Sequence, residues 1–65
     1  MTTNMTAPTI LARYTNEEYG IESVVTKGAN GYHATLRDTD ADEAIQTRIY
    51  GTREVAEAYA ESLVK

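Results

Sequence analysis

Nucleophilic catalysis in this chain would have to draw on a single histidine, His33, and on two serines, Ser23 and Ser62, besides the threonines. Such a reaction needs a nucleophile, a base and a group that orients the base, all within hydrogen-bond reach. His33 falls in the middle of a predicted strand and on its outward face, which is typical of a surface residue. An enzyme site also needs a sizeable concave pocket, which a thin two-layer fold does not readily enclose. We therefore expect no catalytic residue and no enzymatic activity.

Three aspartates at alternate positions, Asp38, Asp40 and Asp42, are similar to the start of a calcium-binding loop. An EF-hand loop has glycine at its sixth position and a bidentate glutamate at its twelfth. Here those two positions hold Glu43 and Ile49, and the flanking segments are predicted strands rather than helices. The sequence therefore predicts no metal site and no cofactor. Asp38, Asp40, Asp42 and Glu43 form either a solvated loop or a negative protrusion aimed at a basic partner.

Three further carboxylates, Glu54, Glu57 and Glu61, follow one ridge of the predicted C-terminal helix. One interpretation is an ordinary solvated helix face. The other joins this ridge to the acidic loop as one negative surface, whose carboxylates imitate a row of phosphates in a groove built for nucleic acid. The sequence alone does not place loop and ridge on the same side of the molecule.

Alternating polar and aromatic residues on two strands predict a contact patch on the sheet face that the helix leaves open. Tyrosine and arginine are favoured as interface anchors, so Arg37, Arg48 and Tyr50 are the expected anchors. The alternative is the ordinary polar face of a two-layer domain. The complete predicted patch is His33, Thr35, Arg37, Gln46, Arg48 and Tyr50.

These side chains need a sheet to hold them, and the sequence predicts one. Alternation and β-branched residues indicate strands, while a Gly-Ala-Asn-Gly run indicates a hairpin turn. In the first strand Ile10, Ala12 and Tyr14 are expected on one face. In the last, Ile45, Thr47 and Ile49 are expected to oppose the polar set of Gln46, Arg48 and Tyr50. The predicted segments are an arm over 1–8, strands over 9–15, 19–27, 32–37 and 44–50, the turn 28–31 and the acidic loop 38–43.

A helix is predicted over 52–64. Thr52 is a suitable N-cap, and Glu54 in the first turn suits the helix dipole. Apolar residues at helical spacing predict the face that covers the sheet. Those residues are Val55, Ala56, Tyr59, Ala60, Leu63 and Val64. The fold class is therefore α+β, with an antiparallel meander of three or four strands and one C-terminal helix on one face, in a single domain over 9–65.

Sixty-five residues with no cysteine exclude a multi-domain enzyme and a disulfide framework. The formal charge is −4, from ten acidic and six basic residues. A nucleic-acid binder usually has the opposite sign, because it gains affinity by neutralising phosphates. An acidic chain is attracted to basic protein surfaces. With neither a signal-like start nor a membrane-length apolar run, we expect a cytoplasmic protein, in the host cytoplasm if a phage encodes it.

Residues 31–37 (GYHATLR) and 48–60 (RIYGTREVAEAYA) resemble DNA-binding domains made of a three-stranded sheet and a helix. The arm-binding domains of tyrosine integrases and the plant ethylene-response-factor domains are of this kind. The resemblance implies that residues of the exposed sheet face, here Arg37 and Arg48, enter the major groove. In size, acidity and lack of cysteine the chain also resembles small phage-encoded inhibitors, such as anti-CRISPR proteins and uracil-DNA glycosylase inhibitors, and no residue role follows from that.

Three hypotheses follow. The first is a non-enzymatic protein that docks on a partner with a basic surface and inhibits or modulates it, in its most concrete form a phage-encoded inhibitor of a nucleic-acid-handling complex. The second is a small DNA- or RNA-binding domain that uses the open sheet face. The third is a self-associating module, because free edge strands and a small core favour homodimers.

Overall fold

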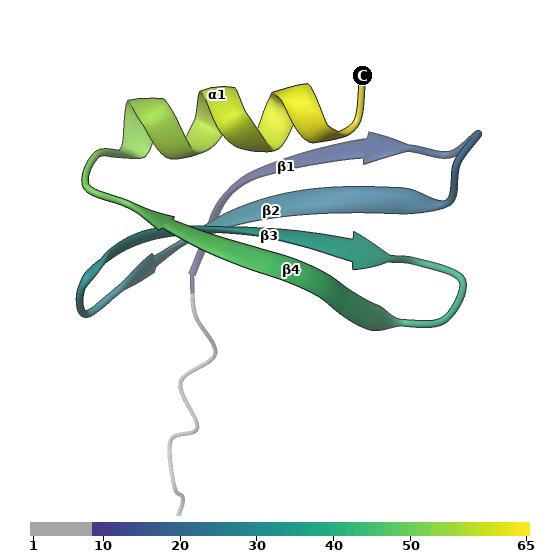
Figure 1. Ribbon diagram of the computed structural model, residues 1–65, viewed down its shortest axis with the longest axis horizontal. Helices are drawn as coiled ribbons and strands as arrows, with labels where there is room; N and C mark the ends of the chain where they lie inside the picture. Colours follow the sequence, from purple (N-terminus) through teal and green to yellow (C-terminus); the bar gives the residue numbers. More distant parts are fainter. Residues whose placement is uncertain (1–8) are drawn as a thin grey trace, which may run out of the picture.

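The computed structural model describes residues 9–65, and the predicted arm over 1–8 lies outside them (Figure 1). The described chain forms a four-stranded antiparallel sheet in the order β1-β2-β3-β4, followed by one helix. This confirms the predicted α+β meander with a C-terminal helix. The elements are β1 (Ile10–Asn16), β2 (Ile21–Gly28), β3 (Gly31–Asp38), β4 (Glu43–Tyr50) and α1 (Arg53–Leu63).

Helix α1 lies along one face of the sheet and packs chiefly on β2 and β3 (Figure 1). Its N-terminus lies beyond β4 and its C-terminus lies near the β1–β2 turn. The opposite face of the sheet carries no covering element from residues 9–65. Within these residues no helix is both long and apolar enough to cross a bilayer.

The core between sheet and helix is built from small side chains. Val25, Ala34, Ala56 and Ala60 are fully buried and form one cluster. Alanines at i and i+4 of the helix leave room for its backbone to approach the sheet closely. Val55 was predicted to lie on the helix face that covers the sheet, and this prediction is wrong. Its side chain is 49% exposed, because this first-turn residue points away from the sheet.

Side chains satisfy backbone groups at both ends of α1. The Thr52 hydroxyl accepts a hydrogen bond from the Val55 N–H, which confirms Thr52 as the N-cap. At the other end, Asn16 Nδ2 donates to the Val64 carbonyl over 2.7 Å, and the Ser23 hydroxyl donates to the Ala60 carbonyl over 2.6 Å. The last carbonyls of a helix have no partner within the helix, so β1 and β2 supply the donors that end it.

The β2–β3 hairpin confirms the predicted turn, with Gly28 paired to Gly31 around Ala29 and Asn30. The positive φ falls on Gly31, at +145°, and a Cβ there would lie 2.5 Å from the Tyr50 carbonyl oxygen. Glycine is needed at this position for both reasons.

The first strand departs from simple alternation. The β1–β2 register shifts between Ile10 and Ala12, so that Leu11 packs toward the core together with Ala12 and Tyr14. Ile10 pairs with Thr26 and lies on the open face. The prediction that Ile10 shares a face with Ala12 and Tyr14 is therefore wrong, because one extra residue in the strand inverts the pattern beyond it.

Candidate protein-binding surface

The two faces of strand β4 are reversed relative to the prediction, so that the residues expected on the open face lie on the helix side. Gln46, Arg48 and Tyr50 pair with Leu36, Ala34 and Tyr32, which are residues of the helix-covered face. Directly paired residues of neighbouring strands point to the same side. The predicted patch of six residues on the open face is therefore wrong, since only His33, Thr35 and Arg37 lie there.

The three relocated side chains surround Tyr59 of α1. Gln46 Nε2 donates to the Tyr59 hydroxyl over 2.6 Å, and the rings of Tyr50 and Tyr59 lie 5.3 Å apart. The Arg48 guanidinium lies 5.8 Å from the centre of the Tyr59 ring. Tyr50 and Arg48 thus pack along the flank of the helix, and the expectation that Arg37 and Arg48 enter a DNA groove from one sheet face is wrong.

The open face is ordered in three rows that run across the strands. The first row, nearest the β2–β3 turn, is Ile10, Thr26, His33 and Ile49. The second row is Arg13, Val24, Thr35 and Thr47, and the third is Thr15, Glu22, Arg37 and Ala44. Charge on this face therefore increases from the β2–β3 turn toward the other end of the sheet.

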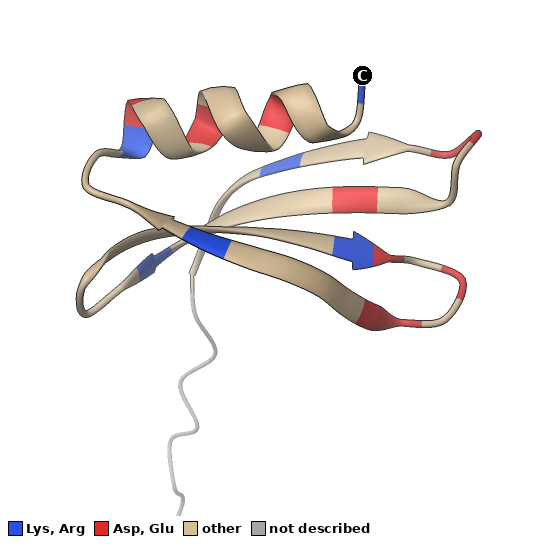
Figure 2. Ribbon diagram, viewed as in Figure 1, with Lys and Arg blue, Asp and Glu red and all other residues tan. Residues whose placement is uncertain are grey.

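That other end is strongly acidic. In an antiparallel meander, the β1–β2 turn and the β3–β4 turn lie at the same end of the sheet, and Figure 2 shows acidic residues in both turns at that end. The Thr39 N–H donates to the Gly20 carbonyl over 2.9 Å, which joins the two turns directly. We call this surface the acidic end. Its six carboxylates belong to Glu17, Glu18, Asp38, Asp40, Asp42 and Glu43.

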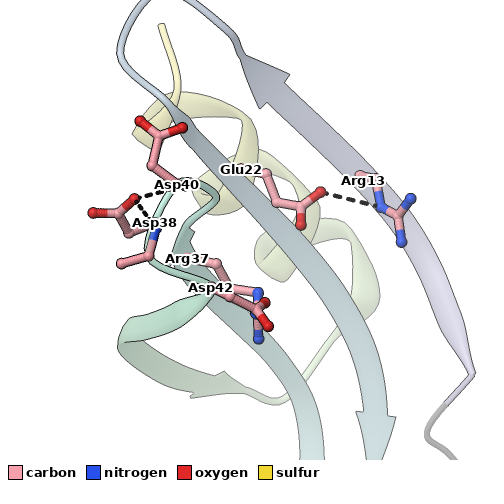
Figure 3. Close-up of polar contacts among 7 residues, drawn as sticks. Arg13, Glu22, Arg37, Asp38, Asp40 and Asp42 are labelled. Atoms are coloured by element: carbon pink, nitrogen blue, oxygen red, sulfur yellow. Dashed lines mark hydrogen bonds and ion pairs between the residues drawn. The ribbon is translucent and has the colours of Figure 1, made fainter.

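The predicted loop acids have different local roles (Figure 3). Asp38 Oδ1 accepts from the backbone N–H groups of Asp40 and Ala41, at 2.9 and 3.1 Å, and so holds the turn. Asp42 has a φ of 56° and accepts a hydrogen bond from Arg37. Asp38 and Asp42 therefore shape the loop as well as charge it, and no separate binding role is needed to explain them.

The remaining acids of this end are more available to a partner. Glu17, Glu18, Asp40 and Glu43 are exposed. The Asp40 carboxylate lies over Gly20, where a Cβ would come within 2.8 Å of it. Gly20 also has a φ of 66°, a conformation that glycine adopts at no steric cost. A Cβ at position 20 would push the Asp40 carboxylate away, so glycine there allows Asp40 to lie over the β1–β2 turn.

The helix acids form a separate surface beside β1. Glu57 accepts from Arg53, whose guanidinium also donates to the Leu11 carbonyl, and Glu61 pairs with Lys65. The hydrogen bond to Glu57 raises the pKa of Arg53. Partial burial, followed by the charges of Glu57 and Glu61, raises the pKa of Tyr14 on β1. Glu54 lies in the first turn of α1, at the end away from the acidic turns.

Glu17 and Glu18 are not among the predicted site residues, because they fall between the predicted strands 9–15 and 19–27. The signal was available, because alternate turns of an antiparallel meander always meet at one end. Among residues 9–65, no group of three or more potential ligands is placed to hold a metal ion. Comparisons with protein-family models, with curated proteins and with solved structures find no match for this chain.

Proposed function

We propose that this chain is a small, non-enzymatic binding protein that docks through its acidic end on a basic surface of a partner protein and inhibits or modulates that partner. In its most concrete form, the chain is a phage-encoded inhibitor of a nucleic-acid-handling complex, of the anti-CRISPR kind, and acts in the host cytoplasm. The observation that carries the proposal is the contact between the β1–β2 and β3–β4 turns, which concentrates six carboxylates at one end of a 65-residue chain.

The electrostatics of this end favour a basic partner. Charges grouped on one surface produce a field that steers a complementary partner and raises its association rate. The negative C-terminal end of the α1 dipole also points toward this end of the sheet. A protein surface that normally binds phosphates offers the complementary charge, so such a surface is the kind of target we propose.

Nucleic acid itself fits the molecule less well. On the open face, Arg37 donates to Asp42, and Arg13 pairs with Glu22 at 3.4 Å (Figure 3). Both arginines of that face are thus partly neutralised by neighbouring carboxylates, which reduces the attraction of the face for phosphates.

The test compares two variants that lose the same charge. Glu18→Gln with Asp40→Asn removes two exposed carboxylates from the acidic end, and Glu54→Gln with Glu61→Gln removes two from the helix. A partner captured from the native host and identified by mass spectrometry is purified and its association rate is measured. At about 50 mM salt we expect the acidic-end variant to associate several-fold more slowly and the helix variant to change little.

The rates of wild type and acidic-end variant should converge at about 0.5 M salt, where the Debye length is only a few ångströms. The proposal also requires that the wild-type chain lowers an activity of the partner and competes with nucleic acid for it. Equal slowing in both variants would show that net charge alone matters. Clear retention of duplex DNA or RNA by the chain in a gel shift at about 50 mM salt would favour the open-face nucleic-acid alternative instead.

A further inference from the structure

Strand β4 forms one edge of the sheet (Figure 1). From Gln46 to Tyr50 its residues pair with β3 in unbroken register, and the register shift before Gln46 leaves Ile45 without a partner on β3. Within residues 9–65, no backbone group other than those of β3 bonds to the main chain of this stretch. An edge strand presents unpaired N–H and C=O groups to which another extended chain can add. The regular stretch is about 17 Å long, so it has room for a short segment.

Arg48 lies in the middle of this stretch and has no carboxylate partner in the part of the chain that the structure describes. It pairs across the ladder with Ala34, and its guanidinium lies 5.8 Å from the centre of the Tyr59 ring. The side chain is exposed, so its positive charge remains available beside the edge. The ion pairs among residues 9–65 use the other arginines and the last lysine, which are Arg13, Arg37, Arg53 and Lys65.

The edge formed by β1 differs in its charge. The Arg13 guanidinium there pairs with Glu22 at 3.4 Å. Arg53 pairs with Glu57 and also donates to the Leu11 carbonyl. The positive groups beside β1 are therefore already matched by carboxylates of the same chain, and the helix acids lie on this side of α1. A negatively charged segment is attracted to the β4 edge rather than to the β1 edge.

The two faces of the β4 stretch require different side chains from an added strand. Arg48 lies on the helix side, whereas Ile49 lies on the open side and is 54% exposed. Side chains alternate along a strand and interact with their neighbours across a strand pair. Alternate residues of an added strand would therefore lie beside Arg48 and beside Ile49. The added strand would also remove water from the guanidinium, which is costly unless a carboxylate replaces that water.

We propose that the β4 edge, from Gln46 to Tyr50, binds an extended acidic segment of another protein as a fifth strand of the sheet. An acidic residue of the segment pairs with Arg48 on the helix side, and an apolar residue packs on Ile49 on the open side. The backbone hydrogen bonds provide the affinity. Arg48 provides the selectivity, because a basic segment is repelled and an uncharged one leaves the guanidinium without an acceptor.

Three fluorescein-labelled peptides test the proposal with the full chain. GSVEVEVSG alternates apolar and acidic residues, GSVKVKVSG replaces the acids by lysine, and GSVEPEVSG has proline at its centre. Anisotropy is measured up to about 1 mM protein in about 0.15 M salt, and ¹⁵N backbone spectra locate each peptide. We expect the acidic peptide to bind with a dissociation constant on the order of 0.1 mM and to shift the amides of β4. The lysine peptide and the proline peptide should bind at least about five-fold more weakly, since one is repelled and the other loses a ladder hydrogen bond.

Arg48→Glu should reverse the preference, so that the lysine peptide binds more tightly than the acidic one. Lys27→Glu is the matched control, because Lys27 likewise has no carboxylate partner among residues 9–65 and lies 5.3 Å from the centre of the Tyr32 ring. Lys27 belongs to the inner strand β2, so this change should alter the dissociation constant of the acidic peptide by no more than about two-fold at this salt concentration. Circular dichroism verifies that each variant is folded.

Several results would overturn the proposal. They are no binding of the acidic peptide up to about 1 mM, equal binding of the proline peptide, and amide shifts confined to β1 or to the acidic end. Shifts of β4 that depend on protein concentration without peptide would identify a second copy of the chain as the occupant instead. None of these results bears on the docking of the acidic end, which is measured with a different partner and different variants.

Discussion

Small residues hold α1 against the sheet at close range, and Ser23 is the most instructive of them. It is fully buried, and its hydroxyl donates to the Ala60 carbonyl over 2.6 Å. The Val64 N–H, which would bond Ala60 in a continuing helix, is directed to Glu61 instead. A serine in a buried strand position therefore completes the hydrogen bonding of the last helical turn.

Replacing Ser23→Ala should lower the free energy of unfolding by about 1–3 kcal/mol, because the buried Ala60 carbonyl loses its donor. Urea unfolding followed by circular dichroism measures the change. Ser62→Ala is the control, since the exposed Ser62 hydroxyl bonds the Tyr59 carbonyl over the same 2.6 Å distance. That variant should stay within about 0.5 kcal/mol of wild type, and equal losses in the two would contradict the role assigned to Ser23.

Among the elements, β4 shows that the alternation of polar and apolar residues does not predict which face of an edge strand is covered. Its apolar residues Ile45 and Ile49 are exposed, while Gln46, Arg48 and Tyr50 lie on the helix side. Because α1 is centred on β2 and β3, the outer strand is only partly covered on the helix side and uncovered on the open side. Hydrophobicity therefore does not decide which way it turns. The contacts with Tyr59 show the orientation that the fold adopts.

The orientation of β4 is tested by Tyr59→Phe. The variant loses the hydrogen bond from Gln46 and should be less stable by about 0.5–1.5 kcal/mol. Tyr19→Phe is the control, because Tyr19 is 68% exposed and its hydroxyl bonds to none of residues 9–65. Thermal unfolding compares the two. Were Gln46 on the open face, as the sequence pattern predicts, removing the Tyr59 hydroxyl would cost no more than the control.

At the scale of the whole molecule, charge and apolar surface are separated along the sheet. Six carboxylates lie at the end of the two joined turns, whereas the row of Ile10, Thr26, His33 and Ile49 lies toward the β2–β3 turn. Like charges held this close repel one another and reduce stability. A fold that keeps them together is therefore less stable than its contacts would allow, which is consistent with a surface used for binding.

Removing one carboxylate from the acidic end should stabilise the protein. Glu18→Gln is expected to raise the free energy of unfolding by about 0.2–0.5 kcal/mol in low salt, and the gain should vanish near 0.5 M salt. Glu54→Gln should have the opposite sign, a loss of about 0.3–1 kcal/mol, because Glu54 interacts favourably with the N-terminus of α1. Chemical unfolding at two salt concentrations measures both, and a shared sign would show that only net charge matters.

The sequence by itself determined the elements and the fold class. Thr52, the apolar spacing after it and the Gly28–Gly31 turn are local signals, and helix and hairpin formed where these signals lie. Local signals act over a few residues, so they are readable without the rest of the chain. The sequence also implied the position of the acidic end, because an antiparallel meander brings Glu17 and Glu18 to the same end of the sheet as the aspartates.

Only the tertiary structure decided which side of each outer strand the helix covers. The register shift at Leu11 moves Ile10 to the open face, and the pairing of β4 with β3 turns Arg48 and Tyr50 toward α1. Alternation divides a strand into two faces but does not say which of them another element will bury. That choice depends on one helix that spans two strands of four, and no stretch of neighbouring residues carries this information.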